Sequence, residues 1–211
     1  MKRELCMIVL LSAGAPVLAG GTSEPPVRAE AKPGQAFEVG TLLSSGRENL
    51  AAGKCTEAVA LFEKALSIDP ANPEAVFGLS ASFIELKRYA EALPLLEKLN
   101  KEVPENPMVR NNLAWALLHI RGEAAANAPR AIKLARAALL DVPSDVSVWN
   151  TLGEAYYAAG NFEKALQAAR SGLRLSVLAG ITNSPCSELV TRCRKAAGAA
   201  ALETLNPDRP E

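Results

Sequence analysis

The chain has 211 residues, in which 23 Lys and Arg side chains balance 23 Asp and Glu side chains. A chain without net charge lacks the basic excess that attracts nucleic acid or anionic lipid, so we expect neither as a direct partner. Alanine is prominent among the 49% of hydrophobic residues, and only 5% of the residues are aromatic. This composition favours closely packed helices, and we expect an all-α protein.

The first 19 residues have the features of a secretory signal peptide. Lys2 and Arg3 precede a short apolar run at 6–11, and Val17-Leu18-Ala19 suits a signal peptidase site. The run is shorter than the roughly 20 apolar residues that span a bilayer. We therefore expect cleavage after residue 19 and an exported, periplasmic protein, the alternative being an uncleaved anchor. Residues 20–36 carry several prolines and few apolar side chains, which indicates a flexible linker.

Three sets of residues recur along the chain with one shared spacing. The intervals are 34, 39 and 34 residues for a small residue, and 34 and 39 for both a proline and a leucine. The sets are Ala58, Ala92, Ala131 and Ala165; Pro70, Pro104 and Pro143; and Leu79, Leu113 and Leu152. Because independent markers share one period, we interpret the chain as an array of helical repeats that bury a core only by stacking.

The last of these repeats has the most complete pattern. Trp149, Leu152 and Tyr156 are three and four residues apart, so they share one face of a helix. Gly160 ends that helix, and Ala165 lies in the next one, where it packs against the first. This segment resembles the first part of a tetratricopeptide repeat.

The resemblance covers roughly residues 38–177, and it implies an architecture. It implies a right-handed α-solenoid of about four helix-turn-helix repeats, with a concave groove lined by the first helix of each repeat. The repeat domain is expected at 37–178, with repeats at about 39–72, 73–106, 107–145 and 146–178.

Departures from the repeat pattern give further expectations. The third repeat is five residues longer, and residues 121–129 are expected to form an exposed turn between its helices. Asn49 stands at an aromatic position, so the first helix of the first repeat is expected to be weak, as in terminal repeats. Ser184 and Pro185 suit a helix start, and a helix at 184–205 is expected to cap the last repeat, with a tail at 206–211.

No set of residues indicates catalysis, a cofactor or a metal. The single histidine, His119, cannot supply a triad or a zinc site with the usual ligands. Cys55 is interpreted as a buried apolar side chain. Cys186 stands at a helix N-terminus, where the thiol pKa is expected to be lowered. Cys186 and Cys193 are seven residues apart, too far along one helix for a disulfide. We expect a protein that is not an enzyme and takes no small-molecule substrate.

The resemblance places a set of side chains in the groove, outside the core of the repeats. We predict that these residues bind a peptide or partner helix, with membrane contact only through partners; the alternative is that they pack on the linker, on the C-terminal helix or on each other. The predicted set is Phe77, Ile84, Met108, Asn111, Trp115, Leu118, Asn150, Glu154 and Tyr157.

Two functions fit these expectations. The first is a protein–protein interaction module of the cell envelope. The second is a structural subunit of an envelope assembly, secretion or pilus complex without an exchangeable ligand.

Overall fold

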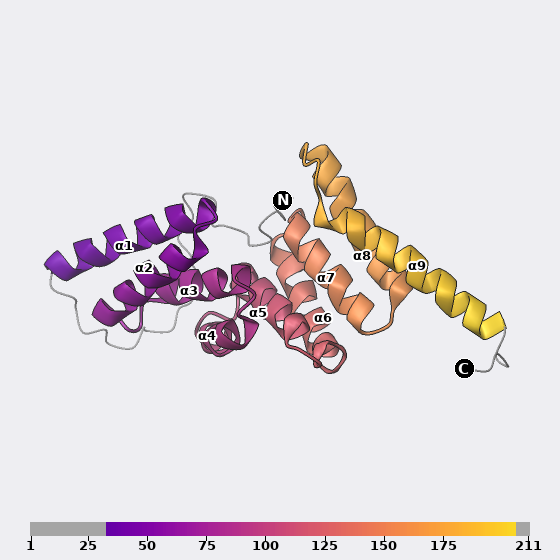
Figure 1. Ribbon diagram of the computed structural model, residues 1–211, viewed down its shortest axis with the longest axis horizontal. Coiled ribbons are helices and arrows are strands. Elements are labelled where there is room, and N and C mark those ends of the chain that lie inside the picture. The colour runs from indigo at the N-terminus through magenta and orange to yellow at the C-terminus, as the bar shows by residue number, and fades with distance from the viewer. Residues whose placement is uncertain (1–32, 206–211) are drawn as a thin grey trace. The chain divides into compact units, whose positions relative to one another are not determined.

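The computed structural model describes residues 33–205, and it places nine α-helices and no strands in that range (Figure 1). The predictions for the signal peptide, for most of the linker and for the tail at 206–211 lie outside the described residues. The helices are α1 (Pro33–Ala51), α2 (Cys55–Ile68), α3 (Pro73–Glu85), α4 (Tyr89–Glu102), α5 (Pro107–His119), α6 (Ala124–Asp141), α7 (Val146–Ala158), α8 (Phe162–Leu178) and α9 (Pro185–Leu205). The expected all-α class is confirmed.

The described residues form two compact units, whose boundary lies within α5. The N-terminal unit comprises residues 33–116, and the C-terminal unit comprises residues 117–205. In the N-terminal unit α1 to α4 pack on their neighbours in chain order, and in the C-terminal unit α6 to α9 do the same, as in an α-solenoid. None of the helices in the described range is long and apolar enough to cross a membrane.

The core of the N-terminal unit centres on Phe62 of α2. Its ring is fully buried and lies between Gly46 of α1 and Gly78 of α3. A Cβ atom at residue 46 would lie 2.7 Å from Cε1 of the ring, and one at residue 78 would lie closer still. Glycine at both positions therefore allows three consecutive helices to pack around one aromatic side chain.

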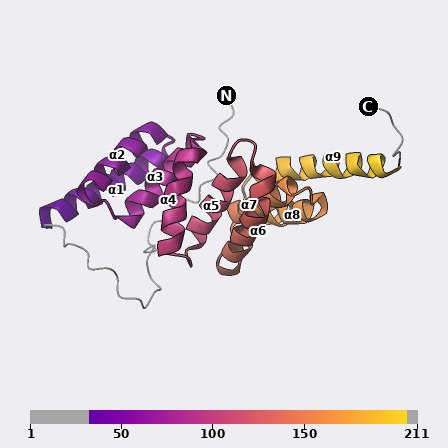
Figure 2. The same ribbon diagram turned by 90° about the horizontal axis from the view of Figure 1, so that it is seen from below.

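In the C-terminal unit, α9 packs on both α8 and α7, as α3 packs on α2 and α1. It thus occupies the first-helix position of a fifth, incomplete repeat. Leu189 of α9 is buried against Gly153 of α7, and Cys186 is buried against Gly172 of α8. The C-terminal turns of α9 extend beyond the other helices of this unit (Figures 1 and 2).

Short polar side chains cap the N-termini of α3 and α7. Asn72 Oδ1 accepts a hydrogen bond from the Ala75 backbone N–H at 3.0 Å, ahead of α3. Asp145 Oδ1 accepts from the N–H groups of Ser147 and Val148 at 2.8 and 3.2 Å, ahead of α7. Each cap satisfies donors that the first turn of a helix leaves without a partner, and so fixes where the helix begins.

The expected turn at 121–129 is wrong for most of its length, because α6 already begins at Ala124. The extra residues lengthen this helix to 18 residues, against 14 in α4. Three consecutive alanines have high helix propensity. In addition, Asn127 Nδ2 donates to the Leu117 carbonyl oxygen at 3.0 Å, which ties the added segment to the preceding helix. Pro129 lies inside α6, where it removes one backbone hydrogen bond without ending the helix.

Two further observations concern the start of the repeat array and its last repeat. Helix α1 begins at Pro33, inside the range expected for the linker, so residues 33–36 are helical. Trp149, which shares a helical face with the buried Leu152, is only partly buried. Its indole Nε1 donates to the Pro143 carbonyl oxygen at 2.7 Å and so joins α7 to the loop before it.

Candidate interaction surface

The nine residues predicted to line the groove differ in accessibility. Five side chains are buried, with exposed fractions of 7% or less, and four are partly exposed. The buried residues are Phe77, Ile84, Asn111, Leu118 and Asn150, and the partly exposed residues are Met108, Trp115, Glu154 and Tyr157. The five buried side chains lie in the interior of their units. Direct contact of these side chains with a partner stays a prediction.

Phe77 belongs to a hydrophobic cluster of the N-terminal unit. The cluster includes Val76, Leu99, Val103 and Val109, and Met108 of α5 packs against it. The aromatic ring thus contributes to the packing of α3 on α4. Of the predicted groove residues in this cluster, Phe77 is buried and Met108 is partly exposed, so Met108 is the one of the two that a partner can reach.

Asn111 is a buried amide in α5 of the N-terminal unit. Its side chain is 2% exposed, and Oδ1 has no hydrogen-bond partner within the described residues. A buried polar atom without a partner costs about 1–3 kcal/mol. Asn150, one repeat further along the chain, is equally buried but belongs to α7 of the C-terminal unit. Binding of a peptide or partner helix by the two amides stays a prediction.

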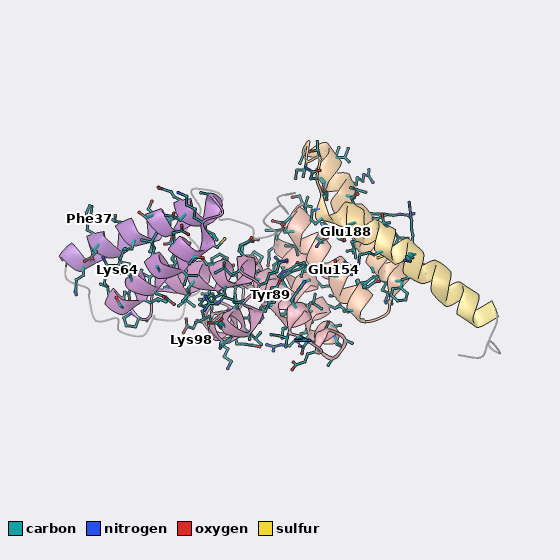
Figure 3. The ribbon with its side chains drawn as sticks, viewed as in Figure 1. Phe37, Lys64, Tyr89, Lys98, Glu154 and Glu188 are labelled. Atoms are coloured by element: carbon teal, nitrogen blue, oxygen red, sulfur yellow. The ribbon has the colours of Figure 1, made fainter. Side chains whose placement is uncertain are left out.

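In the C-terminal unit, Glu154 and Tyr157 of α7 share one partner on α9. The two terminal guanidinium nitrogens of Arg192 donate to the two carboxylate oxygens of Glu154, at 2.7 and 3.2 Å. Figure 3 labels Glu154 among the side chains. The guanidinium carbon of Arg192, Cζ, lies 4.5 Å from the centre of the Tyr157 ring. Phe162 of α8 lies on the ring as well, with the centroids 5.3 Å apart. We call Glu154, Tyr157 and Arg192 the α7–α9 triad.

The triad is ordered and partly open to solvent. Bidentate, charge-assisted hydrogen bonds are directional, and they fix Arg192 over the tyrosine ring. The Glu154 side chain is 19% exposed and that of Arg192 is 40% exposed. Burial lowers the pKa of Arg192, but the hydrogen bond and charge of Glu154, together with Tyr157, outweigh it and raise the pKa above its ordinary value. The triad therefore presents an acceptor, a donor and an aromatic face at fixed positions.

Arg192 is not among the residues predicted from the sequence to bind a partner. A signal was present, because Arg192 lies three residues after Leu189 and next to Cys193, two apolar side chains of the helix expected at 184–205. A long basic side chain at the edge of that side reaches the neighbouring helix with its head group. The predicted alternative, that groove residues pack on the C-terminal helix, describes Glu154 and Tyr157 in this structure.

Three cysteines lie within the described residues, and their surroundings do not favour a reactive thiolate. Cys186 and Cys193 are buried and Cys55 is partly buried, and all three are free. Burial raises the pKa of Cys186, although a hydrogen bond with Ser184 acts in the opposite direction. The expected lowering by the helix N-terminus is therefore wrong, because desolvation of a buried thiolate outweighs it. Within the described residues, no group of three or more His, Cys, Asp or Glu side chains could hold a metal ion.

The packing of consecutive helix pairs defines an α-helical repeat protein. Two models of the tetratricopeptide repeat match the chain, one at residues 49–116 and one at residues 123–176, which together cover more than half of it. The chain belongs to the tetratricopeptide repeat family.

Two curated proteins are similar to parts of the chain. The RNA polymerase-associated protein CTR9 of Saccharomyces cerevisiae is 34% identical over 57% of this chain and 12% of its own length. Interferon-induced protein with tetratricopeptide repeats 3 of Mus musculus is 28% identical over 71% of this chain and 35% of its own length. The chain thus spans only a minor part of each of these larger proteins.

Several solved structures share the fold. The tetratricopeptide repeat protein TTC0263 of Thermus thermophilus is 19% identical, with a TM-score of 0.58 over 75% of this chain and 98% of that one. MamA from AMB-1 is 26% identical, with a TM-score of 0.54 over 66% of this chain and 80% of that one. MamA from Desulfovibrio magneticus RS-1 is 18% identical, with a TM-score of 0.55 over 77% of this chain and 96% of that one.

Family and fold together define the class of function. Proteins of this family are typically non-enzymatic scaffolds that bind other proteins, and the chain is a protein–protein interaction scaffold of that class.

Proposed function

We propose that the chain is a non-enzymatic interaction module of the cell envelope, and that it binds an extended peptide or a partner helix along the first helices of its repeats. The observation that carries this proposal is the α7–α9 triad. It lies on two helices that occupy successive first-helix positions, and its side chains are ordered before any partner arrives. A preorganised surface loses less conformational entropy on binding than a flexible one.

The chemistry of the triad suits a peptide. Tyr157 offers an apolar face together with a polar hydroxyl, a combination common at the centre of protein interfaces. Arg192 has donors beyond those engaged by Glu154, and these can reach a backbone carbonyl or a carboxylate of the partner. In the N-terminal unit, the partly exposed Trp115 and Met108 of α5 provide a second, apolar contact.

The envelope setting rests on the N-terminal sequence. Its basic start, short apolar run and cleavage site are those of an exported protein. We expect the protein recovered from the periplasmic fraction to begin at Gly20, which N-terminal sequencing of that fraction would measure. Recovery of a chain that starts at Met1 from membranes alone would contradict the export proposal and leave the binding proposal intact.

The binding proposal is tested by capture from envelope extract with the full chain as bait, followed by titration of a peptide from the captured protein. We expect Tyr157→Ala and Trp115→Ala each to weaken binding by about tenfold or more, as loss of a central interface aromatic does. Tyr89→Ala is the matched control, because Tyr89 is a partly buried tyrosine on α4, a second helix.

Two outcomes would count against this function. Unchanged affinity in both variants, with the folded state intact by circular dichroism, would place the contact elsewhere. A partner recovered at fixed stoichiometry that free peptide cannot displace would favour the structural subunit.

A further inference from the structure

The second helices of the four repeats reverse their charge at equivalent positions. These positions have the same 34, 39 and 34 residue spacing as the repeat alanines. The first position holds Glu57, Glu91, Arg130 and Lys164, and the second holds Glu63, Glu97, Arg136 and Arg170. Both positions are therefore acidic in the N-terminal unit and basic in the C-terminal unit.

These positions lie on the outer side of each second helix. In α2, the buried side chains Ala58, Phe62 and Ala65 centre on one side of the helix. At about 100° per residue, a stripe through Glu57 and Glu63 centres on roughly the opposite side. Seven of the eight charged residues are exposed and Glu97 is partly exposed. We define the acidic face as Glu57, Glu63, Glu91 and Glu97, and the basic face as Arg130, Lys133, Arg136, Lys164, Arg170 and Arg174.

Cations near the acidic face already have partners within the N-terminal unit. Lys64 Nζ lies 3.3 Å from Glu38, and Lys98 Nζ lies 4.0 Å from Glu102. Arg88 is bound to Glu91 and is also acted on by the charge of Glu63. These pairs reduce the acidic character without removing it, because Glu57 has no ion pair within the described residues.

The basic face is more strongly charged. Four of its members, Lys133, Arg136, Arg170 and Arg174, form no ion pair within the described residues. Residues 33–116 hold 8 basic and 11 acidic residues, and residues 117–205 hold 10 basic and 7 acidic. The two units thus have net charges of −3 and +3, which cancel over the described part of the chain.

Exposed apolar side chains border the basic face. Leu140 at the end of α6 is 85% exposed, and Val177 and Leu178 at the end of α8 are 70% and 77% exposed. In the N-terminal unit, Phe37 of α1 is 79% exposed. Large apolar side chains beside a charged surface are typical of protein–protein contacts, in which burial adds to electrostatic attraction.

We propose that the basic face of one molecule docks on the acidic face of a second copy of this chain. The two faces have the same construction, since each is built from the outer sides of two second helices that are one repeat apart in the sequence. Their charges are opposite at the same repeat positions, and the unit charges are equal in size. A second copy is therefore the partner for which the chain itself supplies the complementary charge. This contact uses second helices and is separate from the peptide surface of the first helices.

An exposed electrostatic contact must depend on salt. We expect the full chain to associate in about 20 mM NaCl and to be monomeric in about 500 mM NaCl, where the Debye length falls from about 20 Å to about 4 Å. Sedimentation velocity at both salt concentrations measures this association.

Charge reversal tests which faces meet. R136E with R170E lowers the charge of the basic face from +6 to +2, and E57R with E63R brings the charge of the acidic face from −4 to zero. Each double variant alone is expected to associate with an affinity lower by about tenfold or more. An equimolar mixture of the two is expected to associate again, because each then supplies the face that the other lacks. R194E with K195E on α9 is the matched control, since it changes the charge of the same unit equally at exposed residues outside the face.

A sedimentation coefficient that is the same at both salt concentrations would overturn the proposal. So would a mixture that stays monomeric while both variants are folded. Binding of the basic face to anionic lipid vesicles without any self-association would assign the face to a membrane surface instead, and would equally overturn it.

Discussion

Replacement of Phe62 by alanine is expected to lower the free energy of unfolding of the N-terminal unit by about 3–5 kcal/mol. The ring is fully buried, and it occupies the space left by two glycines on the helices before and after it in the packing order. Gly46 and Gly78 have no side chains that can move into the vacated space, so the cavity should persist and the cost should lie near the upper end. Urea denaturation followed by circular dichroism at 222 nm measures the change.

Phe37→Ala is the matched control for this prediction. It makes the same chemical change on α1, where the side chain is 79% exposed. A surface substitution of this kind is expected to change stability by about 0.5 kcal/mol or less. Equal losses for the two variants would show that Phe62 does not form the centre of this unit.

The repeat markers explain why much of the fold could be predicted from the sequence. An alanine that recurs at one fixed place marks the close approach of two helices, and Ala58, Ala92, Ala131 and Ala165 are all fully buried. Periodicity indicates such contacts because equivalent positions in each repeat form the same helix–helix contact and hold the same residue type. The all-α class and the repeat family followed from this evidence.

The added segment of the third repeat shows where periodicity gives no information. The spacing located five extra residues between Leu113 and Ala131, but it carries no information about their conformation. Local propensity decided that, since the alanines at 124–126 favour extension of α6 and Asn127 secures it to the Leu117 carbonyl. Pro129 and Gly122 suggested a turn, yet only Gly122 has the left-handed backbone, with φ of 80°.

The candidate site was harder to predict, because it depends on which helices pack against each other, and here on the packing of α9 on α7. The resemblance assigned Glu154 and Tyr157 to an open surface, whereas α9 lies beside α7 and brings Arg192 to both of them. The same packing explains Cys186, whose helix N-terminus lies in an apolar interior against Gly172 and not in solvent. Neither outcome can be read from spacing within one helix.

The largest effect expected in the C-terminal unit comes from Leu189 of α9, which is 1% exposed and packs with Ala165, Ala169 and Val190. Leu189→Ala is expected to lower the free energy of unfolding of this unit by about 2–5 kcal/mol, by the loss of burial and the cavity that remains. Gly153→Ala is expected to cost about 1–3 kcal/mol, because its new Cβ would lie 2.6 Å from Leu189 Cδ2.

The double variant tests whether these two residues form the contact that holds α9 on α7. Once Leu189 is shortened, the Cβ at residue 153 no longer meets it and fills part of the cavity, so the double variant should be more stable than the sum of the two single losses predicts. Gly198→Ala is the control, because a Cβ there has no atom within 4 Å and should instead stabilise α9 by up to about 1 kcal/mol. Urea denaturation of all four variants gives the coupling energy. Strict additivity would mean that α9 is held on α7 by other contacts, with the α7–α9 triad as the first to examine.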